Sequence, residues 1–304
     1  MTDEIEFIKS ELKKKGYPLE NYVQALLVGK DWHVQPNAYF WDKDTNKGRE
    51  LDIKAIYERF KSNSWSSFIL NLFIQCRRLP GNAWIFFSVP KGSVLYAPIS
   101  RYGLAKFLQS QKMFVRTPAI FDYKGTHFDR SEVLATNYCE IITDKKKSNK
   151  RDDNIWECVV TLIKATSQAL EEAQADSKQY LEEDLGSFQE YIGDSGPYEL
   201  ISVLYPLIVF EGKIYAAKFF EEGITLQRRD YVQLFVDYHS GRYKGKFRID
   251  IVTKKRFPYY LEDILKDLTL YDKRRVEEAK EYEDSVVEGV KKYFRKLAQQ
   301  GNIL

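Results

Sequence analysis

The chain has few of the residues that build disulfides or zinc sites. Among its 304 residues are only three cysteines and three histidines. Cys76, Cys139 and Cys158 are widely spaced, form no Cys-x-x-Cys pair and show no zinc-type spacing with the histidines. A disulfide framework and a zinc centre are therefore not what organises this fold, and we expect a reducing, cytoplasmic location.

Long apolar runs and a strong excess of one charge are also missing. The segment from Met1 to Glu6 is acidic, and no apolar run long enough to span a bilayer follows, so we expect neither export nor membrane insertion. Lys+Arg 47 against Asp+Glu 44 gives a formal net charge of +3, which does not decide for or against a polyanionic partner. We find no internal repeat, no phosphate-binding glycine loop and no nucleophile elbow. With 44% hydrophobic and 30% charged residues, the composition predicts a globular protein with a sizeable core.

Two short alternating segments carry most of the chemical information. In a strand, side chains alternate between faces, so Glu50, Asp52 and Lys54 share one face of the first segment. Gln75 and Arg77 share a face of the second segment in the same way. If the two strands are neighbours, an acidic pair meets an amide and a guanidinium, which could hold a divalent cation and a phosphate. The alternative is a sheet with one solvated polar face, as antiparallel sheets commonly have.

A third candidate acid comes from a predicted helix. Residues 3–15 predict a short charged helix ending at Gly16, and Pro18 fits the first turn of a second helix. Glu20 lies on the edge of the apolar stripe of this second helix, where a carboxylate needs a partner. The alternative is an exposed glutamate favoured by the helix dipole. The stripe itself consists of Leu19, Tyr22, Val23, Leu26 and Leu27.

The rest of the pattern predicts strands and helices in turn. A hairpin is expected from 32–41 through the polar turn 42–48 into the strand around Asp52. A strand over 68–78 is expected to end at Leu79-Pro80-Gly81-Asn82, before a buried strand over 83–89. Buried pieces are expected at 107–108 and 113–115, followed by a charged linker over 144–153. A long helix should come next, with one apolar side made of Trp156, Val159, Val160, Ile163 and Leu170. A β-meander is expected over 199–254, with Gly212 as a turn and a single strand over 224–238, and then helices over 258–268 and 273–299.

Three motifs follow one another in the first third of the chain. They are Gly16-Tyr17-Pro18-Leu19-Glu20 opening a helix, Arg49-Glu50-Leu51-Asp52-Ile53-Lys54-Ala55 on a strand, and Gln75-Cys76-Arg77-Arg78 before Trp84-Ile85-Phe86-Phe87. In this order and spacing they resemble the PD-(D/E)xK, or restriction-endonuclease-like, nuclease superfamily. The similarity is to bacterial members that carry Glu-Cys-Lys-Lys before an aromatic strand, here in a Gln-Cys-Arg variant.

The resemblance implies roles for four residues. Asp52 matches the metal-binding aspartate and Glu20 the helix glutamate, while Gln75 stands where a second metal-binding acid is usual and Arg77 where the catalytic lysine is. The implied chemistry is hydrolysis of a phosphodiester by an endonuclease-like enzyme that uses Mg²⁺ or Mn²⁺. Because an amide adds no charge, we expect the metal to bind weakly. A guanidinium can hold a phosphate but is a poor proton carrier.

Four basic residues are weaker candidates for nucleic-acid contact: Lys54, Arg78, Arg242 and Lys244. The last two belong to a stretch in which cations and aromatic residues interleave, as they do on nucleic-acid-binding surfaces. The alternative for that stretch is an exposed hairpin tip.

We therefore expect an α/β fold with a restriction-endonuclease-like mixed sheet flanked by helices over residues 1–143. Residues 144–304, with the long helix, the β-meander and the C-terminal helices, either extend that core or form a second lobe. The function predicted is a metal-dependent nuclease, acting on DNA in preference to RNA, or a degenerate descendant that only binds nucleic acid. The alternative is a non-catalytic interaction or scaffold module with the same fold.

Cys76 should be a buried, unreactive thiol, because alternation points it into the core.

Overall fold

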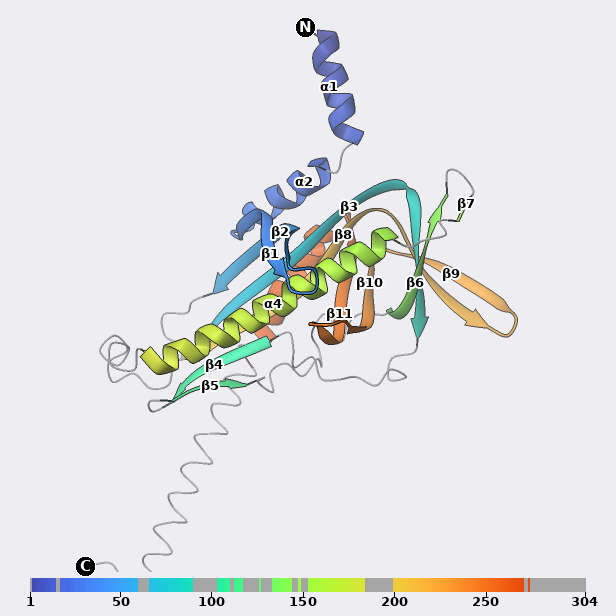
Figure 1. Ribbon diagram of the computed structural model, residues 1–304. Coiled ribbons are helices and arrows are strands. Elements are labelled where there is room, and N and C mark those ends of the chain that lie inside the picture. Colours follow the sequence, from blue (N-terminus) through green and yellow to red (C-terminus); the bar gives the residue numbers. More distant parts are fainter. Residues whose placement is uncertain are drawn as a thin grey trace, which may run out of the picture.

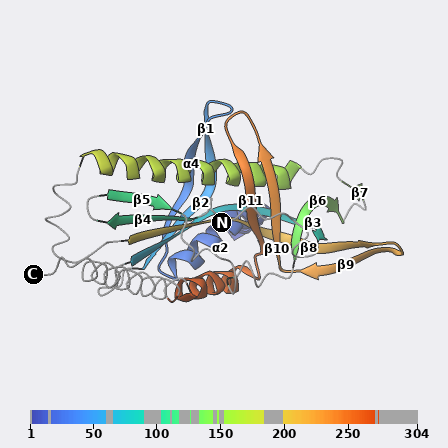
Figure 2. The same cartoon turned by 90° about the horizontal axis from the view of Figure 1, so that it is seen from below.

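The protein is described here from a computed structural model, in which one large mixed sheet runs through the molecule and helices lie on both of its sides (Figure 1). Figure 2 shows helix α4 on one side of the sheet, and α2 with a helix over 257–270 on the other. The protein is thus of the α/β class. The structure describes residues 2–14, 17–59, 66–89, 103–109, 112–116, 126, 133–143, 147–148, 153–183, 199–270 and 273.

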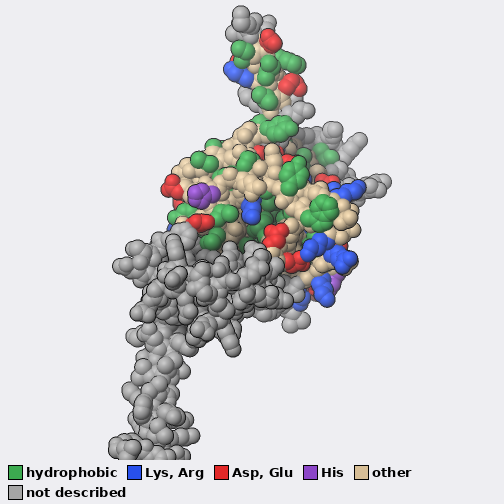
Figure 3. Space-filling model, turned by 60° about the vertical axis from the view of Figure 1, so that its left-hand side comes forward, with side chains coloured by type: hydrophobic (Ala, Val, Ile, Leu, Met, Phe, Trp, Pro, Cys, Tyr) green, Lys and Arg blue, Asp and Glu red, His purple; other side chains and the backbone are tan. Residues whose placement is uncertain are grey.

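Two helices open the chain, as predicted: α1 (Thr2–Lys14) and α2 (Tyr17–Val28). The apolar stripe of α2 packs into the core, where Leu19, Val23 and Leu27 are fully buried. In contrast, α1 stands clear of the body, and Figure 3 shows hydrophobic side chains on its surface. Those with large exposed fractions are Ile5, Phe7, Ile8 and Leu12.

The strands of the sheet have a branched order. The main path is β1-β2-β3-β6-β10-β11-β8-β4-β5, with β7 beside β6 and β9 beside β8. Their bounds are β1 (His33–Asp42), β2 (Lys47–Arg59), β3 (Ser66–Val89), β4 (Gly103–Gln109), β5 (Lys112–Arg116), β6 (Leu134–Ile142), β7 (Lys147–Ser148), β8 (Glu199–Phe220), β9 (Gly223–Arg229), β10 (Tyr231–His239) and β11 (Lys244–Thr253).

A further pairing joins β3 to β8, so that β3, β6, β10, β11 and β8 form a closed ring of hydrogen-bonded strands. Each strand of the ring therefore has neighbours on both sides, whereas β1, β5, β7 and β9 each have a single partner among the described strands. Because β8 lies beside β3 along most of its length, residues 1–143 and 144–304 contribute to one sheet and to one main hydrophobic cluster. The predicted boundary at residue 143 therefore does not separate two sheets.

The predicted end of a strand at Leu79–Asn82 is wrong. β3 continues through this segment, and its register with β8 shifts between Arg78 and Ala83. β8 also continues through Gly212, where a turn was predicted, and a Cβ added there would lie 2.9 Å from the carbonyl oxygen of Leu79. Proline and glycine here produce an irregularity at which both strands bend together, visible as the arch of β3 and β8 in Figure 1.

The predicted β-meander is also wrong. β11 pairs with β8 in parallel and β10 pairs with β6 in parallel, whereas a meander has only antiparallel neighbours. The strand predicted over 224–238 is divided at Asp230 into β9 and β10, which have different partners. Alternation along a strand determines which face is buried, but the neighbouring strand is chosen by packing across the whole sheet.

The long helix α4 (Asp153–Glu183) agrees with the prediction, and Val159 and Ile163 are buried as expected. Trp156 is not, because it is 45% exposed and lies beside the ring of Tyr238 with centroids 6.0 Å apart. The buried stripe passes instead through Ile155, Cys158, Val159, Leu162 and Ile163, one residue and about 100° away from Trp156.

Some predictions fall partly outside the described residues. The helix predicted over 258–268 is present over 257–270, but the helix predicted over 273–299 lies beyond the described part apart from residue 273. Strands β4 and β5 contain the pieces at 107–108 and 113–115, whose side chains are not described. Of the predicted linker over 144–153, the structure describes only β7 and the start of α4. None of the described helices is long and apolar enough to cross a membrane.

Candidate functional site

The predicted acid and amide lie on neighbouring strands. β2 and β3 pair antiparallel with Ile53 opposite Ile74, the positions directly beside Asp52 and Gln75. The backbone N–H of Cys76 on β3 donates a hydrogen bond to Asp52 Oδ2 at 2.6 Å. The predicted pairing of the two strands is therefore confirmed. Since only 2% of Gln75 is exposed, the shared polar face is covered at this position and is not a simple solvated face.

The Asp52 carboxylate is held in a position where its charge is only partly compensated. Burial raises the pKa of Asp52 above its usual value, and the nearby Glu50 carboxylate adds to this effect. The N–H of Cys76 and the guanidinium of Arg77 act in the opposite direction without cancelling the rise. A carboxyl group whose ionised form is destabilised by burial and by a neighbouring charge is a candidate functional group.

Glu20 approaches the same place from helix α2. Burial raises the pKa of Glu20, repulsion from Asp52 and Glu50 raises it further, and the Arg77 guanidinium lowers it. Since these charges act on Glu20 and helix α2 contacts both β2 and β3, Glu20 lies near the strands that carry Asp52 and Arg77. The buried neighbours of Glu20 on α2, such as Leu19, fix the helix against the sheet.

Arg77 supplies the positive charge of the cluster. Burial works to lower the pKa of Arg77, but the surrounding groups Cys158, Asp52 and Glu157 raise it, so the guanidinium is always charged. Its Nη2 lies 3.8 Å from Oε2 of Glu157 on α4, whose side chain is 66% exposed. Arg77 can therefore turn from this loose partner to bind a phosphate, but it cannot carry a proton.

The Gln75 amide is the unusual member of the group. Its Nε2 is buried and has no hydrogen-bond partner among the described residues. Its interaction with the Asp52 carboxylate nevertheless lowers the pKa of Asp52. A buried amide nitrogen without a partner costs about 1–3 kcal/mol, so such groups in native proteins call for an explanation. Rotation of the amide by half a turn would direct its oxygen toward a cation instead.

The cluster can be compared with the needs of a divalent cation. Within the described ranges, no three His, Cys, Asp or Glu side chains are placed to hold a metal together. Glu20 and Asp52 provide two carboxylates, and Gln75 provides a neutral oxygen. Mg²⁺ is commonly bound by one or two carboxylates while it keeps several waters, so this donor set fits a weakly held ion.

Two of the weaker basic candidates lie near the cluster. The ammonium of Lys54 lies over the ring of Phe73, 5.9 Å from its centroid, on the face that also carries Asp52. Arg78 pairs with Glu211 on β8, with 3.1 Å between Nε and Oε2. Lys54 is thus available to a bound polyanion, whereas much of the charge of Arg78 is neutralised by Glu211.

The other two basic candidates lie at the far hairpin. The turn between β10 and β11 contains Arg242, which is exposed and whose backbone N–H donates to Asp44 Oδ1 at 2.9 Å. Lys244 begins β11. Tyr243 and Phe247, the aromatic residues of the interleaved stretch, are buried, so their rings cannot stack on nucleic-acid bases.

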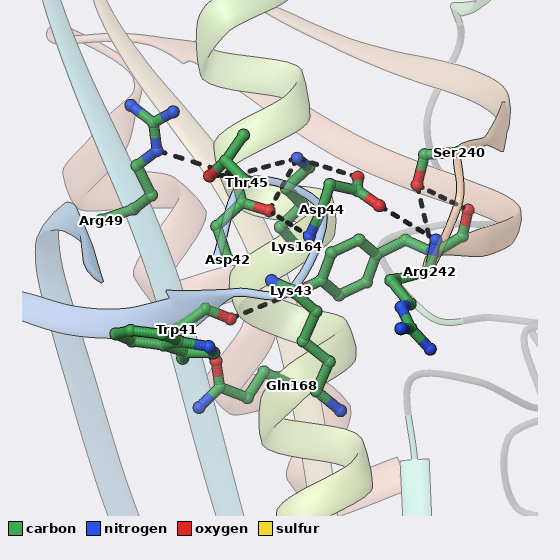
Figure 4. A network of polar contacts seen from close by, with 11 residues as sticks. Trp41, Asp42, Lys43, Asp44, Thr45, Arg49, Lys164, Gln168, Ser240 and Arg242 are labelled. Carbon is green, nitrogen blue, oxygen red and sulfur yellow. Dashed lines mark hydrogen bonds and ion pairs between the residues drawn. The ribbon is translucent and has the colours of Figure 1, made fainter. Parts of the chain in front are cut away.

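Sequence reasoning missed a second polar cluster, shown in Figure 4. Lys164 on α4 donates to both carboxylate oxygens of Asp42, at 2.9 and 3.0 Å, and pairs with Asp44 at 3.0 Å. Burial alone would raise the pKa of both aspartates, but the Lys164 ammonium lowers both, helped by Thr45 at Asp42 and by the backbone N–H of Arg242 at Asp44. The cluster fixes the β1–β2 hairpin to α4. In the sequence, Asp42 and Asp44 look like parts of an exposed turn, and their partner lies 122 residues from Asp42.

A third cluster surrounds Asp250, which is 1% exposed. The hydroxyls of Tyr231 and Tyr260 donate to it at 3.0 and 2.7 Å, and Gln233 donates at 3.2 Å. Burial raises the pKa of both tyrosines well above the usual value. With several donors around one carboxylate, this cluster is explained as a satisfied buried network that ties β10, β11 and the helix over 257–270 together.

Comparison with known proteins adds no relative, since no protein-family model, no curated protein and no solved structure matches the chain significantly. The function is therefore inferred from the residues of the cluster around Asp52.

Proposed function

We propose that this chain is a nuclease-like protein of the PD-(D/E)xK type, with a restriction-endonuclease-like core built on α2, β2 and β3. The observation that carries the proposal is the meeting of Glu20 and Asp52. The two carboxylates come from separate elements: the charges of Asp52 and Glu50 raise the pKa of Glu20, and the charge of Glu50 raises the pKa of Asp52. Acidic groups gathered in this way are typical of sites that bind a cation.

The charge balance of the cluster supports the same proposal. Three carboxylates, those of Glu20, Glu50 and Asp52, interact with one another, and Arg77 opposes the rise in pKa of both Glu20 and Asp52. A cluster that served only stability would be expected to neutralise its charges more completely, as the Lys164 cluster does. The remaining negative charge favours a divalent cation.

Each residue then has a role that its geometry allows. Asp52, Glu20 and the amide oxygen of Gln75 would hold Mg²⁺ or Mn²⁺, which polarises a phosphate and lowers the pKa of an attacking water. Arg77 binds non-bridging phosphate oxygens through its planar fork. The ionised form of Glu20 is destabilised by burial and by the charges of Asp52 and Glu50, so a bound cation would stabilise this carboxylate. Lys54 contacts the nucleic-acid backbone. We propose DNA as the preferred substrate, ahead of RNA.

The proposal includes a degenerate form, in which binding persists and cleavage is lost. Gln75 and Arg77 replace a charged ligand and a mobile ammonium, so both metal affinity and proton transfer are weakened. Restoring the usual residues, in the double variant Gln75→Glu with Arg77→Lys, should then increase both metal binding and cleavage. The non-catalytic interaction module is the alternative that the same experiment decides.

The experiment compares wild type, Asp52→Asn, the double variant, and Glu58→Gln as a matched control. Glu58 is an exposed carboxylate on the same strand as Asp52, away from the cluster. Two readouts are needed: the increase of the melting temperature with Mn²⁺ or Mg²⁺, and cleavage of plasmid DNA and of single-stranded RNA.

We expect the metal-dependent increase in wild type and Glu58→Gln, its loss in Asp52→Asn, and a larger increase with new cleavage in the double variant. Efficient cleavage by wild type that is lost in the double variant would show a working variant site and refute the degenerate form. If no variant is stabilised by metal and none cleaves DNA or RNA, the nuclease-like function is wrong and the interaction module takes its place.

A further inference from the structure

Strand β9 forms an exposed edge of the sheet. It pairs with β8 alone among the described strands, and Gly223 to Arg228 are all exposed. Figure 2 shows the end of β8 and β9 projecting from the body as an arm. An uncovered strand edge presents unpaired N–H and C=O groups and is a ready site for pairing with another chain.

The arm also carries large apolar side chains. Ile224 and Leu226 on β9 are 58% and 59% exposed, and Phe219 on β8, which lies opposite Ile224, is 63% exposed. These three share one face of the arm, because Ile224 pairs with Phe219 and Leu226 with Ala217. A natural edge strand is usually protected by charges or proline, and the centre of β9 has neither.

The charges at the two ends of β9 complement each other. Glu221 and Glu222 form the turn before β9, and Arg228 and Arg229 end the strand. If two copies of β9 pair antiparallel with Thr225 facing Thr225, then Glu222 lies opposite Arg228 and Glu221 opposite Arg229. The same register places Ile224 opposite Leu226 of the other copy, so apolar and charged pairs are all matched.

We propose that β9 is an association surface for a second copy of this chain, paired antiparallel about Thr225. A two-fold pairing of this kind uses each contact twice, because residue i meets residue j and j meets i. It adds two apolar cross-strand pairs and the matched charge pairs to the new backbone hydrogen bonds. One strand edge buries less than a standard interface of roughly 1,600 Å², so the dimer should be weak, with a Kd in the micromolar range.

The proposed pairing of charges can be tested with two single variants, each of which should weaken dimerisation alone and restore it when the two are mixed. In Glu222→Arg homodimers two arginines face each other, and in Arg228→Glu homodimers two glutamates do. Each single variant should weaken dimerisation about tenfold or more, because two cross-strand ion pairs become repulsive. When the two variants are mixed, every facing pair is again of opposite charge, so a mixed dimer should form.

An ion pair between positions 222 and 228 of the same molecule cannot explain recovery of dimerisation in the mixture. Positions 222 and 228 are six residues apart, roughly 20 Å along an extended strand, and therefore do not meet in the same molecule. Lys218→Glu is the matched control, since it reverses an exposed charge on the same arm but on β8, one strand away from the edge. All three changed positions, 218, 222 and 228, are exposed, and each variant's fold is checked by circular dichroism.

The measurement is sedimentation velocity from micromolar to submillimolar protein at low and high salt. Support consists of a salt-sensitive dimer for wild type and Lys218→Glu, weakened self-association for each single variant, and recovery in the mixture. A wild type that stays monomeric at the highest concentration overturns the proposal. So does a dimer that both single variants leave unchanged, or a mixture that associates no better than its components.

Discussion

Replacement of Asp42 by asparagine should destabilise the protein by about 3 kcal/mol, although Asp42 lies in a hairpin turn. Its side chain is almost fully buried, and Lys164 donates to both of its carboxylate oxygens. Removing one partner of a buried ion pair typically costs about 3–5 kcal/mol, because the other charge is left uncompensated. Lys164 keeps Asp44 at 3.0 Å, so the lower end of that range applies.

The same hairpin offers a control on the same helix. Lys43 pairs with Glu171 of α4, but these side chains are 43% and 46% exposed. Exposed pairs contribute about 0–1 kcal/mol, so Glu171→Gln should change the free energy of unfolding by less than about 1 kcal/mol. The two variants remove one carboxylate charge each from the contact between the hairpin and α4, and they differ chiefly in burial.

Urea denaturation followed by circular dichroism measures both variants. With a urea dependence of about 3 kcal/mol per molar, Asp42→Asn should lower the midpoint by roughly 1 M. The pKa values of Asp42 and Asp44 are lowered in the folded protein, so their stabilisation is present above the ordinary value of 3.8 and is lost as the pH falls through the lowered values. The difference between wild type and Asp42→Asn should therefore shrink in strong acid. An equal loss in Glu171→Gln, or a difference unchanged in acid, would refute the reasoning.

Two further predictions concern the candidate site. Glu20→Gln and Asp52→Asn should each increase the free energy of unfolding at neutral pH, because both carboxyl pKa values are raised and the ionised forms oppose folding. Wild type should gain stability relative to these variants as the pH falls through the raised values, and urea titrations at neutral and mildly acidic pH measure this; a loss of stability in both variants would contradict it. Cys76 is 6% exposed and burial raises its thiol pKa well above 9.0, so it should resist a thiol reagent in the native protein. Half-buried Cys139 should react first, so Cys139→Ser should remove the fast phase of thiol labelling and Cys76→Ser should leave it unchanged. Rapid labelling of Cys76 in the native protein would contradict this prediction.

The parts of the site that could be predicted are those with local signals. Glu20 is marked by its place beside an apolar helical stripe, and Asp52 and Gln75 by alternation along their strands. These patterns depend on residues a few positions apart, and they located α2, β2 and the first half of β3. The order of the segments along the chain also favoured the pairing of β2 with β3, because consecutive strands are usually neighbours.

The parts that failed depend on contacts between distant segments. Pro80 and Gly81 are strong local breakers, yet β3 continues through them because β8 runs beside it and bends at Gly212. The C-terminal strands were assigned as strands but given the wrong neighbours, since hydrophobic alternation contains no information on pairing partners. Trp156 was placed on the wrong side of α4 because one residue turns a helix by about 100°.

The sequence by itself determined the α/β class, the helices at both ends of the described chain and the short motifs around Glu20, Asp52 and Gln75, because each is set by local periodicity. Only the tertiary structure decided that β3 and β8 close the strands into a ring, that Lys164 meets Asp42 and Asp44, and that Arg77 pairs with Glu157 of α4. The reason is physical: burial and charge compensation are properties of groups brought together across the sheet, and these groups are far apart along the chain.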